Sequence, residues 1–176
     1  MFEGLLGNHR RAGRWAMGCA GLMLALGATV VMPPRPRLVW NASASAPIGL
    51  YALSDAGSLA RGDMVVASLP GEFRMFAARR HYLPANVPLV KRVAAVPGDK
   101  VCAVGKRIFV NGQLVASRLA RDEAGRAMPR WAGCVVLADG RHFLLMAESG
   151  ASFDGRYFGV SETSDIVGKA RLLWRA

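Results

Sequence analysis

Residues 89–99 read Leu-Val-Lys-Arg-Val-Ala-Ala-Val-Pro-Gly-Asp, and this stretch decides the class of fold. The run 89–94 is mostly aliphatic and Pro97-Gly98-Asp99 is a turn sequence, which predicts a strand closed by a tight turn. Side chains alternate along a strand, so Lys91 and Arg92 point to opposite faces and one of them faces the core or a cleft. Lysine can function there, because burial lowers its pKa and yields a neutral amine, whereas arginine stays charged.

Similar strand patterns occur on both sides of this stretch. The dipeptide Asn111-Gly112 lies between two apolar runs and is a strong hairpin signal. Residues 117–132 are polar and predict a loop, whereas the pattern of residues 71–81 decides nothing. Further strands are predicted at 64–67, 106–110, 113–115, 134–137, 142–146 and 166–172. We therefore expect a mainly β domain over residues 38–176.

A different pattern precedes this domain. Residues 15–34 contain no Asp, Glu, Lys or Arg, and the apolar run from Ala16 to Met32 would span roughly 26 Å as a helix. Three prolines between residues 33 and 36 would stop that helix. We therefore expect a basic tail at 1–14 and a single transmembrane anchor at 15–34.

Two alternatives to the anchor stay open at this stage. Ala25-Leu26-Gly27 resembles the small-x-small site of a cleaved secretory signal. A buried soluble helix is the other alternative, although the segment lacks a polar face. Three arginines precede the apolar segment and two follow it, which favours a cytoplasmic N-terminus. Both the anchor and the cleaved signal place residues 38–176 outside the cytoplasm.

Composition excludes little by itself. The net charge of +11 over 176 residues suits nucleic acid or an anionic membrane surface and does not choose between them. The three cysteines show no Cys-x-x-Cys spacing and the three histidines no His-Glu-x-x-His pattern, so we expect no metal site and no organic cofactor.

Several short motifs follow one another along the chain. They are Ser43-Ala44-Ser45-Ala46-Pro47, Arg61-Gly62-Asp63-Met64-Val65-Val66, the stretch 91–99, Val110-Asn111-Gly112 and Ser152-Phe153-Asp154-Gly155-Arg156. In this order they resemble the sequence boxes of bacterial type I signal peptidases (family S26), which are membrane-anchored Ser-Lys proteases. The variant Ser-Ala-Pro-x-Gly-Leu-Tyr is more similar to the TraF-type conjugative-transfer peptidases of that family. The resemblance covers roughly residues 38–171.

This resemblance implies a fold, a place and a reaction. The fold would be a mainly β, signal-peptidase/LexA-like domain preceded by a single N-terminal transmembrane helix. The protein would lie in the bacterial inner membrane, with its catalytic domain on the periplasmic side. Ser45 would be the nucleophile and Lys91 the general base. The Ser45 N–H and the Ser43 hydroxyl would stabilise the oxyanion. The partners would be membrane lipid and a preprotein or prepilin substrate.

The last motif would support the dyad. By the same resemblance, Ser152 would orient the Lys91 amine, and Asp154 would pair with Arg92 or Arg156 and so shape the site. A third catalytic role for Asp154 is the alternative that the TraF-type enzymes suggest.

Departures from the common pattern point to a specialised substrate. Ala46 stands where most signal peptidases have methionine, their proline comes one residue later than Pro47, and residues 147–150 do not match their Gly-Asp-Asn stretch. A pilin or a conjugation or secretion component would fit, released by hydrolysis or cyclised by aminolysis. A non-catalytic membrane-tethered scaffold is the rival reading. A LexA-type repressor is disfavoured, because residues 1–37 show no helix-turn-helix, and we expect no nucleic-acid partner.

The cysteines add one expectation. Cys102 and Cys134 lie in the proposed external domain and could close a disulfide in an oxidising compartment, two buried free thiols being the alternative. Cys19 lies in the apolar segment, where we expect it to serve packing.

Overall fold

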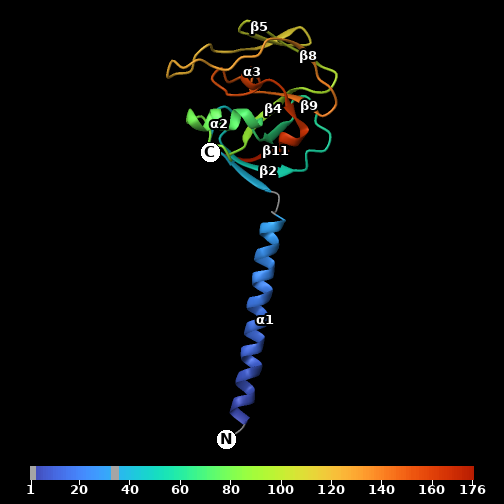
Figure 1. The fold of residues 1–176 in the computed structure, drawn as a ribbon. Helices are drawn as coiled ribbons and strands as arrows, with labels where there is room; N and C mark the ends of the chain where they lie inside the picture. The colour runs from blue at the N-terminus through green and yellow to red at the C-terminus, as the bar shows by residue number, and fades with distance from the viewer. Residues whose placement is uncertain (1–2, 33–35) are drawn as a thin grey trace. The chain divides into compact units, whose positions relative to one another are not determined.

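The computed structural model describes residues 3–32 and 36–176, with the backbone alone for residues 3–12. The chain divides after Pro36 into two units. The first unit contains the long helix α1 and the second, Arg37–Ala176, contains the β-sheets (Figure 1).

Helix α1 (Glu3–Val31) contains the apolar segment. Its residues Gly13–Val31 are long and apolar enough to cross a membrane, and none of this stretch is buried in the structure. A membrane anchor and a signal sequence share these properties, whereas the core helix of a soluble protein would be mostly buried. The helix ends before the expected proline stop, of which Pro33 and Pro34 lie outside the described residues.

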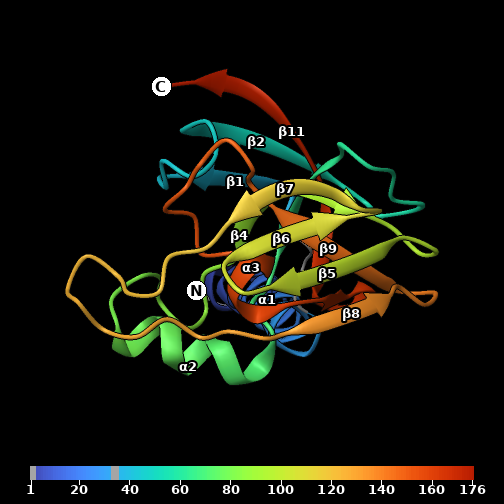
Figure 2. The same ribbon diagram turned by 90° about the horizontal axis from the view of Figure 1, so that it is seen from above.

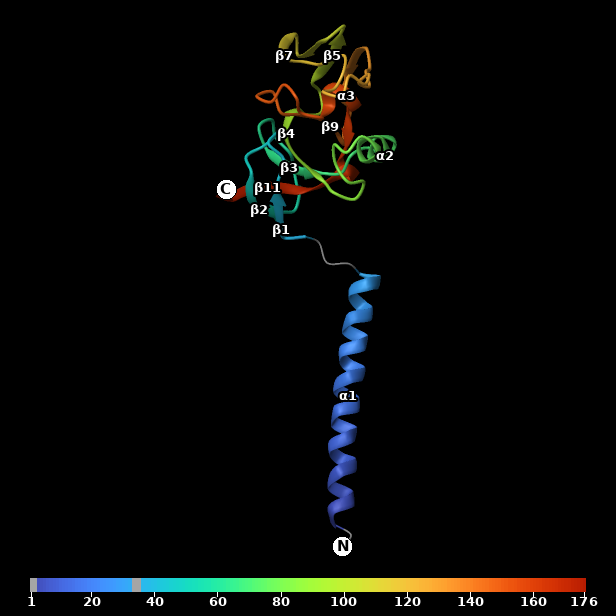
Figure 3. The same ribbon diagram turned by 90° about the vertical axis from the view of Figure 1, so that its left-hand side faces the viewer.

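The second unit is built from two antiparallel sheets, which confirms the expected mainly β class. The larger sheet has seven strands in the order β1 (Leu38–Asn41), β2 (Gly49–Ser54), β11 (Ile166–Arg175), β3 (Met64–Ala67), β4 (Leu89–Ala95), β9 (Arg141–Leu145), β10 (Ser161–Glu162). The smaller sheet has four, in the order β7 (Gln113–Ser117), β6 (Arg107–Val110), β5 (Lys100–Val104), β8 (Gly133–Val136). The smaller sheet lies at the opposite end of the unit from β2 and β11, as Figures 1 and 3 show.

Strand β4 occupies an interior position in the larger sheet. It pairs with β3 through Val65↔Lys91 on one side and with β9 through Val93↔Leu144 on the other. All four of these residues are buried. Because β4 is covered by neighbours at both edges, the side chains on its inner face are held in fixed positions.

Local turn chemistry explains the connection between the sheets. At the predicted hairpin Asn111 and Gly112 both have positive φ, +49° and +82°, as a tight hairpin turn requires. The Asn111 side chain also accepts from the Lys100 N–H at 2.8 Å and donates to Asp99 at 2.9 Å. The hairpin is thereby tied to the turn that follows β4.

Three short helices complete the unit: α2 (Gly71–Arg79), α3 (Gly155–Phe158) and the 3₁₀ turn η1 (Thr163–Asp165). Helix α2 falls in the undecided region 71–81 and lies at the periphery of the second unit (Figure 2). Its aromatic face decides its position, since Phe73 lies 6.0 Å from Phe158 and Phe76 stacks on Phe153 at 5.9 Å between ring centroids. Tertiary packing of aromatic rings fixes this helix, and the sequence pattern alone did not show it.

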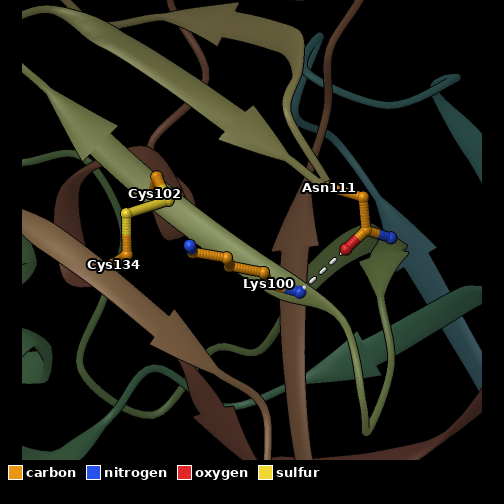
Figure 4. Close-up of a disulfide and its surroundings, with 4 residues drawn as sticks. All are labelled: Lys100, Cys102, Asn111 and Cys134. Atoms are coloured by element: carbon orange, nitrogen blue, oxygen red, sulfur yellow. Dashed lines mark hydrogen bonds between the residues drawn. A yellow bond between two sulfur atoms is a disulfide. The ribbon is translucent and has the colours of Figure 1, made fainter.

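Cys102 and Cys134 form a disulfide between directly opposed residues of β5 and β8 (Figure 4). Cys19 is free. The bond encloses β6, β7 and the connection 118–132, so it fixes both ends of that segment.

We expect the double variant Cys102→Ser/Cys134→Ser to unfold more easily. With 32 positions between the cysteines, loss of the cross-link should lower the free energy of unfolding by about 3–4 kcal/mol in the chain-entropy model. Urea unfolding of the detergent-solubilised full chain, followed by tryptophan fluorescence, measures this. Cys19→Ser is the matched control, and equal midpoints for the two variants would contradict the expectation.

Candidate active site

The loop between β1 and β2 holds the predicted nucleophile, and a buried asparagine shapes it. The Asn41 amide donates to the carbonyls of Ser43 at 2.9 Å, Ala46 at 3.2 Å and Pro47 at 3.0 Å, and its oxygen accepts from the Ser43 N–H at 3.1 Å. Sequence reasoning missed Asn41. An asparagine ahead of a serine-rich turn was the available signal, because its side chain commonly hydrogen-bonds the backbone two residues on.

Lys91 brings together three segments that are distant in sequence. Its Nζ lies 2.8 Å from Ser45 Oγ and 2.9 Å from Ser152 Oγ, and donates to both. The side chain comes from the interior strand β4 and the residue is 2% exposed. A buried amine is thus fixed between two serine hydroxyls.

Burial changes the acidity of this amine. Desolvation lowers the pKa of Lys91 to about 8, more than the negative charge of Asp154 raises it, and Arg156 lowers it further. About half of the molecules at pH 8 therefore carry a neutral amine, which can accept a proton. An exposed lysine would be almost fully charged at that pH.

Ser43 lies beside Ser45 in this loop. Its Oγ is 3.0 Å from Ser45 Oγ, and the Ser45 N–H donates to it at 3.4 Å. The contact from the Ser45 N–H is long for a hydrogen bond, so this N–H is available to donate to an acceptor at a shorter distance. The loop therefore presents two donors, the Ser45 N–H and the Ser43 hydroxyl, next to Ser45 Oγ.

Asp154 and Arg156 form a buried ion pair behind Lys91. The two contacts, 2.8 Å from Nε to Oδ1 and 3.1 Å from Nη2 to Oδ2, make the pair bidentate, and both side chains are at most 1% exposed. Asp154 also caps α3 through the Arg156 N–H at 3.2 Å and accepts from the Met146 N–H at 3.1 Å. The pair joins α3 to the chain that follows β9.

Of the two partners expected for Asp154, the structure shows Arg156, and the alternative pairing with Arg92 is not the one formed. Arg92 projects from the face of β4 opposite to Lys91 and its side chain is 44% exposed. It donates to the Gly62 carbonyl at 3.1 Å and lies 4.0 Å from Glu148. Because side chains alternate along β4, Lys91 and Arg92 point to opposite faces of the strand. Arg92 is therefore not part of the Asp154–Arg156 ion pair.

A cleft of about 770 Å³ opens in front of Ser45 and Lys91. Ser45, Lys91 and Ser152 lie in its lining. Its other walls come from the residues after α2 and from the connection between β7 and β8. The described residues contain no group of three or more His, Cys, Asp or Glu placed to hold a metal ion.

Residues 10–175 match the family model described as signal peptidase, peptidase S26. The chain belongs to this family. Among curated proteins, the chain is 36% identical over 166 residues to the conjugal transfer protein TraF of Agrobacterium fabrum, covering 88% of this chain and 91% of that protein. It is 33% identical over 166 residues to a plasmid transfer protein TraF of Escherichia coli, covering 88% and 89%.

Two further similarities come from signal peptidases. A stretch of 70 residues is 37% identical to signal peptidase I of Pseudomonas aeruginosa, covering 39% of this chain and 20% of that protein. The crystal structure of a signal peptidase I from Enterococcus faecalis matches with a TM-score of 0.37 and 16% identity, covering 65% of this chain and 98% of that chain. Of the proteins named here, the two TraF relatives each match 88% of this chain.

Breaking the buried ion pair should destabilise the fold much more than removing its exposed neighbour. Asp154→Asn leaves the Arg156 guanidinium buried without a counter-charge, which typically costs about 3–5 kcal/mol of unfolding free energy. Arg92→Gln removes an exposed arginine and should cost less than about 1 kcal/mol. Urea unfolding of the full chain compares the two. Similar losses would mean that the Asp154–Arg156 pair does not hold the site together.

Proposed function

We propose that this chain is a membrane-anchored serine endopeptidase in which Ser45 is the nucleophile and Lys91 the general base. The observation that carries the proposal is the 2.8 Å contact between Ser45 Oγ and a lysine amine that is buried and bordered by a second hydroxyl. Membership of the signal peptidase family supports a peptidase.

The reaction follows from these positions. The neutral Lys91 amine accepts the Ser45 proton while Oγ attacks the peptide carbonyl, and the Ser45 N–H and the Ser43 hydroxyl stabilise the oxyanion. The Lys91 ammonium then returns the proton to the leaving amine, which gives an acyl ester on Ser45. Lys91 then accepts a proton from water as the water oxygen attacks that ester, and the Lys91 ammonium returns the proton to Ser45 Oγ as the acid is released. Ser152 keeps the amine aligned throughout.

The substrate class we propose is an exported protein with a leader segment, in particular a pilin or another component of a conjugation or secretion apparatus. The TraF names of the relatives that match most of the chain support a conjugation role. If the substrate's own N-terminal amine replaced water at the acyl ester, the product would be cyclic. Both outcomes use the same acyl-enzyme.

The proposed location is the inner membrane, with the peptidase domain on the periplasmic side and α1 retained as the anchor. Strand β1 begins seven residues after α1 ends. Trp40 on β1 and Trp174 on β11 lie 5.7 Å apart between ring centroids and are 50% and 61% exposed. Exposed tryptophans are typical of the membrane–water interface, so they support a domain held close to lipid.

Three substitutions should separate the roles. Ser45→Ala and Lys91→Ala should abolish processing, whereas Ser43→Ala should slow it about 10²–10³-fold, the usual effect of losing one oxyanion donor. The measurement is a map of mature N-termini of envelope proteins in cells that carry each variant. Termini seen with wild type alone would identify the substrate. An unchanged map for Ser45→Ala, in cells that express the protein and its candidate partners, would favour the rival scaffold role.

The pH dependence should report the Lys91 amine. The base acts in its neutral form and burial lowers its pKa to about 8, so kcat/KM should rise about tenfold per pH unit below 8 and level off above it. Hydrolysis of p-nitrophenyl acetate by the solubilised chain, after subtraction of the Ser45→Ala rate, provides the profile. A plateau that already begins below pH 6 would contradict Lys91 as the base.

A further inference from the structure

The two outer walls of the cleft come from chain segments about forty residues apart. The α2 wall is the connection 80–88, which leads from α2 to β4. The β7–β8 wall is formed by residues 119–128 of the connection between those strands. The first belongs to the larger sheet and the second to the smaller one.

Polar contacts join these walls directly. The Tyr82 hydroxyl donates to Asp122, and Arg80 Nη1 donates to the Ala127 carbonyl at 2.8 Å. Arg126 returns a contact to the Arg80 carbonyl at 3.3 Å and pairs with Asp122 at 2.7 Å. We call Arg80, Tyr82, Asp122 and Arg126 the clasp. Its bonds run in both directions, so neither wall can move without breaking several of them.

The charge at the centre of the clasp persists at every pH at which the protein would work. Burial raises the pKa of Asp122, but hydrogen bonds from Tyr82 and Arg126 outweigh that effect and hold it at about 2. The β7–β8 wall is also stiff by itself. Its turn is closed by the bridge Arg121↔Ala127, and Arg118 donates to the Trp131 carbonyl at 2.7 Å.

The clasp also touches the segment that supports the dyad. The Tyr82 ring lies 5.4 Å from the ring of Phe153, which is the residue after Ser152. Ser152 in turn accepts from the Lys91 amine. This ring contact anchors the clasp against the segment that carries Ser152, and Tyr82→Phe would keep it.

Resting on the proposed function, we propose that the clasp is a specificity-determining element: by joining the two walls it fixes the shape of the cleft in front of Ser45 and so restricts which peptides are cleaved. The residues are positioning residues, since none of them lies at the reacting atoms. The apolar side chains of both walls, such as Leu83, Leu119 and Met128, line the space that the clasp defines. Loosening the clasp should broaden the substrate range and leave the dyad chemistry intact.

The test compares Tyr82→Phe and Asp122→Asn with wild type in the full-length solubilised protein. Tyr82→Phe removes one oxygen and keeps the ring against Phe153, so a folded clasp variant is available even if Asp122→Asn fails to fold. Glu162→Gln is the matched control, because the Arg141–Glu162 pair is also an Arg–carboxylate contact, at 3.1 Å, and lies outside the cleft lining.

Two probes distinguish the outcomes. In a degenerate decapeptide library read by mass spectrometry, the clasp variants should cleave a wider set of sequences. Their selectivity for the best peptides should fall about tenfold, which is the lower end of the discrimination that one pocket contact usually provides. For the best peptides, the clasp variants should differ from wild type through a higher KM more than through a lower kcat. Hydrolysis of p-nitrophenyl acetate, which is too small to contact both walls, should stay within about twofold of wild type, as should both readouts for Glu162→Gln.

Other results would overturn the proposal. A library pattern like that of wild type in Tyr82→Phe, with ester hydrolysis intact, would show that the clasp does not set specificity. Equal losses on the ester and on peptides would show a general structural role. If wild type cleaved neither the library nor the ester above the Ser45→Ala background, the proposed peptidase function itself would fail, and the clasp's role with it.

Discussion

The structure depends on keeping an amine out of water beside a serine hydroxyl. Charged lysine is costly to bury, so Lys91 needs a site where its neutral form is tolerated and its protonated form still has acceptors. Ser45 and Ser152 provide hydroxyls that satisfy either form. A carboxylate in direct contact would have kept the amine charged. Asp154, whose charge does act on the amine, is paired with Arg156 through two contacts.

Backbone packing keeps that acid in place. Gly155 lies so close to β9 that a Cβ there would meet the Leu144 carbonyl at 2.7 Å and the Phe143 ring at 2.8 Å. Only glycine lets α3 approach the sheet closely enough for Asp154 to reach the Met146 N–H. In the motif Asp154-Gly155-Arg156, one ion pair therefore joins the two outer residues, and the glycine between them allows the close approach to β9.

Sequence reasoning reached the parts that depend on local pattern. The strand at 89–94, the Asn111-Gly112 hairpin and the apolar N-terminal helix follow from alternation, turn chemistry and composition. It could not choose between Arg92 and Arg156 as the partner of Asp154, because that choice depends on which face of β4 is covered. The resemblance drew attention to Ser43 and Ser45, but not to Asn41, whose role depends on three carbonyls converging in space. The sequence did not decide whether residues 71–81 form a helix. The position of α2 depends on the packing of Phe76 on Phe153 and of Phe73 on Phe158, which are distant in sequence.

The two sheets carry separable tasks. Every group within hydrogen-bond reach of the Lys91 amine belongs to the larger sheet or the loops between its strands. The smaller sheet contributes the β7–β8 wall, and the Cys102–Cys134 bond holds the base of that wall. In the proposed peptidase, changes in the wall could therefore alter the accepted peptide without moving the dyad. The clasp joins the wall from the larger sheet to the wall from the smaller sheet at the cleft. In the proposed peptidase, a substitution that admits a different peptide would therefore first have to change the clasp.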